Sequence, residues 1–145
     1  MVLVTSRGTE DYLEAIYELI QEKGYARAVD IARRLNVRPP SVTEMVQRLG
    51  NSGFLIYERY RGITLTEEGE RVARSVLKRH NLLFDFLTLL GVDKEVAEQD
   101  ACEIEHHLHP ESIEAIATLL TLLRTPVGER VLEELYSIQG EGGED

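Results

Sequence analysis

The chain has almost no cysteine, with a single thiol among its 145 residues. One cysteine excludes an internal disulfide framework, and a lone thiol suits a reducing compartment. The chain also has no run of about 18 apolar residues, the length that a membrane-spanning helix requires. Residues 1–9 lack the basic flank and the apolar core of a signal peptide. We therefore expect a cytoplasmic protein with no membrane partner.

Positive charge is scarce over the chain as a whole, whose formal net charge is −10. That value argues at first against a nucleic-acid partner, but the charge is unevenly distributed. Residues 1–80 hold 13 Lys/Arg and 11 Asp/Glu, a net charge of +2, whereas residues 81–145 hold 3 and 15, a net charge of −12. This contrast indicates a DNA-facing module joined to a different, acidic one. The alternative is an acidic second half that only keeps the protein soluble.

Residues 9–22 have the apolar spacing of an amphipathic helix, with Thr9 as the expected N-cap. Asp11 and Glu14 lie three residues apart, so they share one face of this helix. The helix dipole also favours acidic residues in the first turn, so the pair alone does not identify a site.

The segment 28–49 predicts a helix-turn-helix. A short helix over 28–35 is followed by a tight turn at 36–38, and two prolines then open a second helix, because proline is tolerated in the first turn. The side chains left outside this second helix suit the major groove of DNA. The residues of this segment that we expect to contact DNA are Arg38, Pro40, Ser41, Thr43, Glu44, Gln47 and Arg48.

Residues 54–66 change to a strand-like alternation around Gly62, which predicts a β-hairpin. Arg59 and Arg61 lie near its tip, where they can contact phosphates or the minor groove. A helix-turn-helix followed by a basic hairpin is typical of a winged-helix DNA-binding domain, which we place at residues 1–66. The alternative is a small α+β domain with an incidental basic hairpin.

The second half of the chain predicts helices only. Residues 67–90 form one long linker helix, and residues 91–138 form further helices with a strongly apolar stripe. We interpret 91–138 as a dimerisation domain, since helix-turn-helix proteins generally bind two half-sites as dimers. Residues 139–145 are expected to be disordered. The expected fold class is therefore mainly α, with an N-terminal winged helix-turn-helix domain and a C-terminal all-helical dimerisation domain.

Cys102, Glu105 and His106 follow a spacing of i, i+3 and i+4, which puts three side chains on one face if they share a helix. A thiolate, a carboxylate and an imidazole together suit a metal ion. The alternative is that Cys102 is a small buried apolar residue and that the other two belong to a solvated face. The spacing alone leaves both interpretations open.

Several longer segments show that the chain resembles the diphtheria toxin repressor family of metal-activated transcription repressors. The resemblance is strongest to its short branch, the manganese transport regulators, and it covers nearly the whole chain. The segments that carry it are Asp11-Tyr12-Leu13-Glu14, Glu22-Lys23-Gly24-Tyr25-Ala26-Arg27, Pro40-Ser41-Val42-Thr43, Leu55-Ile56-Tyr57-Glu58-Arg59-Tyr60-Arg61-Gly62, Arg79-His80 and Ile104-Glu105-His106-His107-Leu108.

The resemblance implies a set of metal ligands in this chain. The positions that match ligands of the family are Asp11, Glu14, His80, Cys102, Glu105 and His106. The manganese branch has glutamate where this chain has Cys102, whereas the iron-responsive branch has cysteine there. The iron-responsive branch in turn has methionine where this chain has Asp11. A second site of the long branch uses a glutamate at the position of Phe84, so that site is not expected here in its usual form.

These ligands lead to an expected function. Carboxylates suit Mn²⁺ and the thiolate favours Fe²⁺ or Zn²⁺, so we expect activation by Mn²⁺ or Fe²⁺, with Zn²⁺, Co²⁺ or Ni²⁺ binding in vitro. The protein is expected to be a homodimeric, metal-activated repressor that binds a double-stranded DNA operator and controls metal-ion homeostasis. One alternative is a winged-helix redox sensor that acts through Cys102. No nucleophile or substrate pocket is evident, so neither an enzyme nor a small-molecule substrate is expected.

Overall fold

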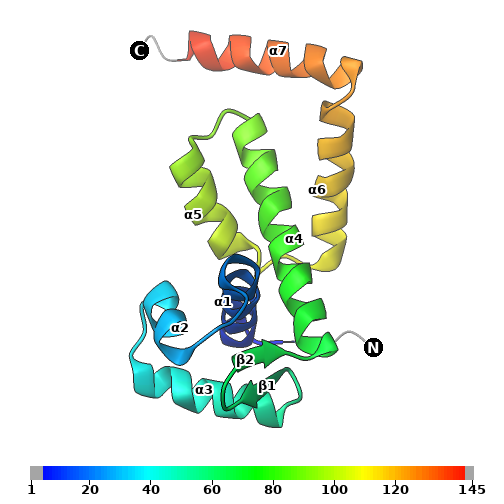
Figure 1. Ribbon diagram of the computed structural model, residues 1–145. Helices are drawn as coiled ribbons and strands as arrows, with labels where there is room; N and C mark the ends of the chain where they lie inside the picture. Colours follow the sequence, from blue (N-terminus) through cyan, green and yellow to red (C-terminus); the bar gives the residue numbers. More distant parts are fainter. Residues whose placement is uncertain (1–4, 143–145) are drawn as a thin grey trace. The chain divides into compact units, whose positions relative to one another are not determined.

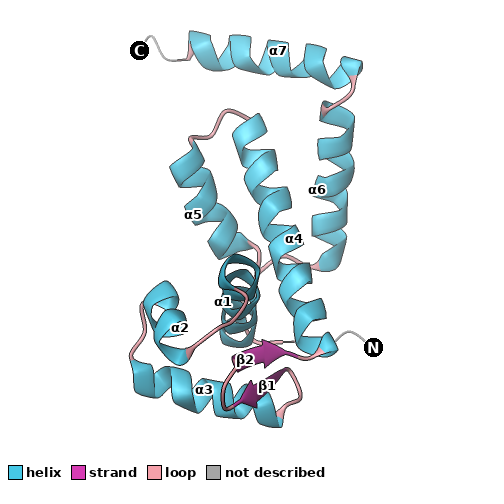
Figure 2. Cartoon of the chain, viewed as in Figure 1, coloured by secondary structure: helices cyan, strands magenta, loops and turns pink. Residues whose placement is uncertain are grey.

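The structure, a computed structural model, describes residues 5–142. In this range the chain forms seven helices and one two-stranded sheet (Figure 2). The residues group into two compact units, Met1–Leu77 and Lys78–Asp145, which are described separately below. The predicted fold class, a winged helix-turn-helix followed by helices, is confirmed. The domain boundaries at residues 66 and 90 stay predictions.

The first unit contains three helices, the hairpin and the start of a fourth helix (Figure 1). Its elements are α1 (Arg7–Lys23), α2 (Ala28–Leu35), α3 (Pro39–Asn51), β1 (Leu55–Glu58), β2 (Gly62–Leu65) and the N-terminal part of α4 (Glu67–Leu89). Apolar side chains from all of these elements form one core, which includes Leu13, Ile16, Ile31, Val42, Leu49, Leu55, Ile63 and Ala73. The expectation that Thr9 caps the first helix is wrong, because the Ser6 hydroxyl accepts the hydrogen bond of the Thr9 N–H.

Two local features fix the shape of this first unit: a tight turn between α2 and α3, and a hydrogen bond between the hairpin and the loop after α1. Asn36, between α2 and α3, has a φ of 54°, a left-handed conformation that asparagine tolerates. The hairpin is held to the loop after α1, because the Ile63 N–H donates to the Ala26 carbonyl at 2.9 Å. Gly62 has a φ of 81°, and an added Cβ there would lie 2.6 Å from the same carbonyl oxygen. Glycine is therefore required where the hairpin meets this loop.

The second unit holds the rest of α4 together with α5 (Lys94–Ile104), α6 (Pro110–Leu123) and α7 (Pro126–Glu141). Helix α7 crosses the C-terminal end of α4 (Figure 1). There Gln139 Nε2 donates to the Leu90 carbonyl at 2.8 Å, and the Tyr136 hydroxyl donates to the Leu89 carbonyl. These two bonds satisfy carbonyls that α4 leaves open at its end. None of the described helices is both long and apolar enough to cross a membrane.

The end of α7 corrects the expected disordered tail. The sequence places its start at residue 139, yet α7 continues to Glu141. The reason is the contact of Gln139 with α4, which holds the last turn of the helix in place. Residues 143–145 of the expected tail lie outside the described residues.

The Gly69→Ala substitution is expected to destabilise the first unit. Gly69 is buried in the first turn of α4, and an added Cβ would lie 1.9 Å from the Phe54 carbonyl oxygen. Such overpacking against backbone costs about 2–3 kcal/mol of unfolding free energy. Gly50→Ala is the matched control, because that helical glycine has only ordinary contacts with Leu55. Urea unfolding of both variants measures the effect, and equal stability of the two would contradict it.

Candidate functional site

His80 is the centre of a group of metal-binding side chains within the second unit. Its imidazole, on α4, is 8% exposed and has a carboxylate at each ring nitrogen. Nδ1 lies 2.8 Å from Glu105 Oε2, and Nε2 lies 3.0 Å from Glu98 Oε1. The hydrogen bond with Glu105 is the main cause that raises the pKa of His80 to about 9; burial opposes it and Glu98 adds to it. In the metal-free protein at neutral pH, His80 is therefore a cation that donates to both carboxylates.

Glu105 lies between two imidazoles. Its second oxygen, Oε1, is 3.2 Å from His106 Nε2, and the side chains of Glu105 and His106 are each 2% exposed. The expected single helix is corrected here, because α5 ends at Ile104. Glu105 is the C-cap and keeps a helical φ of −56° and ψ of −27°, with its N–H donating to the Ala101 carbonyl. Because Glu105 keeps a helical backbone, its side chain lies where the i, i+3 spacing from Cys102 predicted. Its two carboxylate oxygens contact His80 and His106.

Cys102 lies next to His80, with Sγ 3.8 Å from Nδ1. The residue is exposed, so the alternative in which it is a small buried apolar side chain is wrong. The alternative of a solvated face for Glu105 and His106 is also wrong, since both side chains are buried. The structure thus brings together four of the six predicted ligands: His80, Cys102, Glu105 and His106.

Glu98 is a potential ligand that the sequence analysis missed. One donor atom from each of His80, Glu98 and Cys102 lies within 4.8 Å of the other two. The signal was present in the sequence, because Glu98 precedes Cys102 by four residues and so lies on the same face of α5.

Asp11 and Glu14 belong to the first unit, where α1 carries both. Both residues are partly buried, and Asp11 Oδ2 lies 3.9 Å from Arg7 Nε. Their participation in a metal site with residues of the second unit stays a prediction.

The donors in the second unit fit a divalent transition metal. They offer carboxylate oxygen, imidazole nitrogen and thiolate sulfur, the three ligand types that such ions take from proteins. Glu105 is a buried carboxylate whose negative charge is balanced by the proton on His80. A buried charge needs such a partner, and a metal ion could take the place of the proton. His80, Cys102, Glu105 and His106 are the residues of this unit that would hold the ion.

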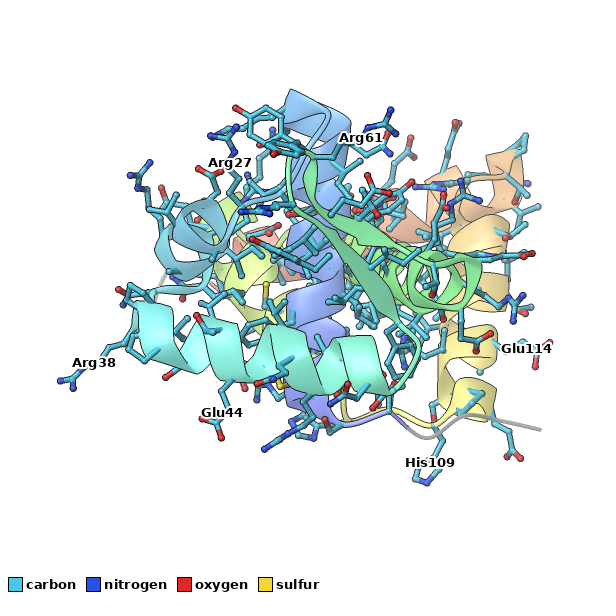
Figure 3. The ribbon with its side chains drawn as sticks, turned by 60° about the horizontal axis from the view of Figure 1, so that its bottom comes forward. Arg27, Arg38, Glu44, Arg61, His109 and Glu114 are labelled. Carbon is cyan, nitrogen blue, oxygen red and sulfur yellow. The ribbon has the colours of Figure 1, made fainter. Side chains whose placement is uncertain are left out.

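The second candidate surface consists of α3 and the hairpin. All nine side chains predicted to contact DNA are exposed, and Arg38 and Glu44 project outward at α3 (Figure 3). Arg61 lies at the hairpin tip, where its Nε is 3.7 Å from Glu58 Oε2. Arg27 was not predicted, yet it adjoins the hairpin, since its Cγ is 3.7 Å from the position of a Cβ on Gly62. Exposed arginines beside a hairpin supply the charge that phosphates require.

Replacement of both Arg59 and Arg61 by alanine is expected to weaken binding to every DNA sequence alike. The logarithm of the DNA association constant falls with the logarithm of the salt concentration, and each arginine that contacts phosphate adds about 1 to the steepness of this fall. Loss of two such arginines should therefore make the slope shallower by about 2. Fluorescence anisotropy at several salt concentrations measures it. Arg71→Ala is the control, because Arg71 is an exposed arginine of the same unit that pairs with Glu68 on α4. An unchanged slope in the double variant would remove the hairpin from the interface.

Comparison with known proteins identifies both halves of the chain. Residues 4–63 match the family description "Iron dependent repressor, N-terminal DNA binding domain", and residues 66–135 match "Iron dependent repressor, metal binding and dimerisation domain". The HTH-type transcriptional regulator MntR of Bacillus subtilis (strain 168) is 50% identical over 136 residues, which are 94% of each chain.

Solved structures agree with this assignment. IdeR of T. acidophilum is 31% identical with a TM-score of 0.71, and the match covers 87% of this chain and 58% of that one. The manganese-activated repressor ScaR is 32% identical with a TM-score of 0.68, covering 77% of this chain and 53% of that one. This chain therefore spans little more than half the length of these two solved proteins. The comparisons do not support a redox sensor that acts through Cys102. The chain belongs to the iron-dependent repressor family and is a metal-dependent, DNA-binding transcription repressor.

Proposed function

We propose that Mn²⁺ or Fe²⁺ activates this repressor through a ligand set centred on His80 and Glu105. The observation that carries the proposal is the buried Glu105 carboxylate, which reaches His80 at 2.8 Å and His106 at 3.2 Å. A bound divalent cation would supply positive charge to this cluster of donors. Asp11 and Glu14 of the first unit complete the ligand set, as the resemblance of the sequence to the family implies.

The ligands explain how metal can control DNA binding. Asp11 and Glu14 lie on α1, which packs in the same core as α2 and α3 of the helix-turn-helix. The remaining ligands lie in the half of the chain that matches a dimerisation domain. Donors shared between the two halves hold the α3 helices of a homodimer at the spacing of two DNA half-sites. Metal then acts as co-repressor, because it favours the DNA-competent arrangement over the others.

The choice of metal depends on ligands that prefer different metals. Carboxylates from Asp11, Glu14 and Glu105 suit Mn²⁺, whereas the thiolate of Cys102 favours Fe²⁺ or Zn²⁺. ScaR, one of the similar proteins, is manganese-activated, and the family description names iron. Both metals are therefore proposed as activators, and Zn²⁺, Co²⁺ and Ni²⁺ are expected to bind in vitro. In the cytoplasm, such a protein would repress genes of metal-ion homeostasis from a double-stranded operator.

Capture of DNA from sheared genomic fragments tests this function. Metal-stripped protein is incubated with chelator, with Mn²⁺, or with Fe²⁺ under anaerobic conditions, and the retained fragments are sequenced. A few specific fragments retained only with metal would support the proposal. The metal that is effective at the lower concentration shows whether the carboxylates or the Cys102 thiolate determine the choice of metal. Equal capture with and without metal would show that the cluster is structural and that the signal lies elsewhere.

A further inference from the structure

Glu44 is an acid on a surface that otherwise carries positive charge. Residues 39–65, from the start of α3 to the end of the hairpin, hold two acids, and the other one, Glu58, has its Oε2 3.7 Å from Arg61 Nε. The Glu44 side chain forms no hydrogen bond or ion pair with the residues that the structure describes. Arg48 follows at i+4, a spacing at which glutamate and arginine can pair on a helix, yet the two are not paired. Glu44 therefore keeps a negative charge that no described residue balances.

The position of Glu44 on α3 directs its side chain away from the core of the first unit. Each residue turns about 100° around an α-helix, so Glu44 lies about 200° from the fully buried Val42 and about 140° from the buried Leu49. Figure 3 shows the Glu44 side chain projecting outward from this helix. The second helix of a helix-turn-helix lies in the major groove of DNA, so this face of α3 is the one that meets base edges.

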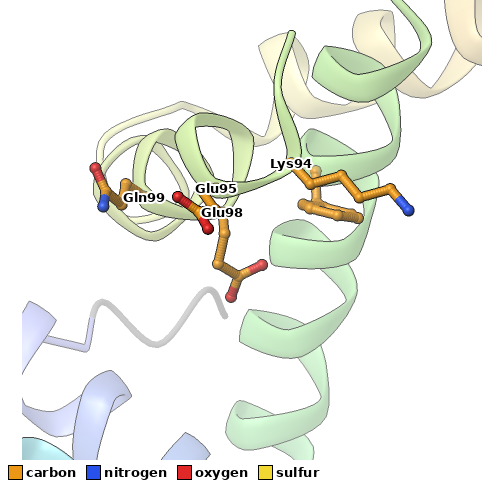
Figure 4. A pocket seen from close by; sticks show the side chains of 5 residues that line it. Lys94, Glu95, Glu98 and Gln99 are labelled. Atoms are coloured by element: carbon orange, nitrogen blue, oxygen red, sulfur yellow. The ribbon is translucent and has the colours of Figure 1, made fainter.

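An exposed acid is ordinary in the acidic second half of the chain, where Glu95 lines an open cavity with Lys94 and Gln99 (Figure 4). On α3 an acid opposes DNA binding, because phosphates repel it. A carboxylate only accepts hydrogen bonds, so it can bind neither phosphate oxygens nor the acceptor atoms of the bases. Its available partners in the major groove are the amino groups of cytosine and adenine. The chemistry of Glu44 therefore favours contact with a base over contact with the DNA backbone.

We propose that Glu44 is a specificity-determining residue that accepts a hydrogen bond from the N4 amino group of one cytosine in each half-site. Adenine fits less well, because its N7 is an acceptor beside the amino group and repels a carboxylate. The repulsion between Glu44 and phosphates adds to the selectivity, since it weakens binding to DNA that lacks this cytosine. This inference rests on the proposed function, because it requires α3 to lie in the major groove of an operator.

Selection of bound sequences from a randomised library of double-stranded DNA, with saturating Mn²⁺, tests the proposal. The wild type is expected to enrich cytosine at one position of each half-site. Glu44→Ala is expected to lose about tenfold discrimination at that position alone and to bind mixed-sequence DNA more tightly. Glu44→Gln is expected to change the preferred base there to adenine, whose N6 and N7 match an amide. Glu67→Ala is the matched control, because Glu67 is an exposed acid of the same unit that lies on α4.

The proposal would be overturned if Glu44→Ala kept the wild-type base preference at every position, or if Glu67→Ala altered the same position to the same extent. Tighter binding of Glu44→Ala without a change in base preference would show only a general effect of charge. The same selection with chelator in place of Mn²⁺ separates this inference from the proposed function. Equal enrichment with and without metal would refute metal activation alone, whereas metal-dependent enrichment with an unchanged preference in Glu44→Ala would refute the role of Glu44 alone.

Discussion

Glu105→Gln is expected to abolish metal-dependent DNA binding while the chain remains folded. The buried Glu105 carboxylate contacts both His80 and His106, at 2.8 and 3.2 Å. An amide keeps the size of the side chain but has no negative charge and only one oxygen to share between a metal and a histidine. Metal affinity is expected to fall at least about 100-fold, a loss of about 2.7 kcal/mol of binding free energy. Isothermal titration with Mn²⁺ and DNA anisotropy with saturating Mn²⁺ measure both effects.

The control for this experiment is Glu114→Gln, an exposed acid on α6 that lies outside the group around His80. It removes the same charge from the same acidic half of the chain, so a general electrostatic effect would appear in both variants. Circular dichroism and a thermal unfolding curve verify that Glu105→Gln folds. Wild-type metal dependence in folded Glu105→Gln would show that Glu105 is not a ligand, and the proposed ligand set would then be wrong.

The helices of this protein were predictable because apolar periodicity and end signals agree. The proline pair forms the first two residues of α3 and marks a true helix start, and Gly91 follows the end of α4 with a φ of 96°. The hairpin is confirmed as well, with Leu55 opposite Leu65 and Glu58 opposite Gly62. Each of these features depends on a few consecutive residues, which is the range over which a sequence pattern carries information.

The features that the sequence did not predict depend on contacts between distant residues. The sequence places Glu98 on the same face of α5 as Cys102, but its contact with His80 on α4, 18 positions earlier in the chain, is seen only in the structure. The order of the last turn of α7 likewise depends on Leu90, which Gln139 reaches across 49 positions. The end of α5 at Ile104 separates Glu105 from its helix, although the i, i+4 backbone bond to Ala101 preserves the spacing. Spacing within one element and the family resemblance were therefore good guides to the ligands, whereas the contacts of Glu98 and Gln139 with other elements required the structure.

Metal affinity is expected to increase with pH, because the metal must displace a proton from His80. The pKa of His80 is raised to about 9 in the metal-free protein, mainly by its hydrogen bond with Glu105. Metals bind the neutral imidazole, so the apparent association constant should increase by about tenfold per pH unit up to about pH 9 and then level off. The stability of the metal-free protein should change in the opposite direction. A raised pKa means that the contribution of His80⁺ is complete below its unfolded pKa of 6.5 and is lost as the pH passes through 9.

Mn²⁺ titrations at pH 7.0 and 8.5 test this expectation, since both values lie between the two pKa values of His80. Titration calorimetry in two buffers of different ionisation enthalpy counts the protons directly, and about one proton per bound ion is expected to come from His80 at pH 7.0. Glu105→Gln provides an internal check, because removal of the carboxylate that raises the pKa should shift the pH dependence to lower pH. If the affinity were the same at both pH values and no proton were released, His80 would either be neutral in the metal-free protein or not be a ligand. Unfolding curves of the metal-free protein at the same two pH values separate these cases, because a neutral His80 would also remove the loss of stability at pH 8.5.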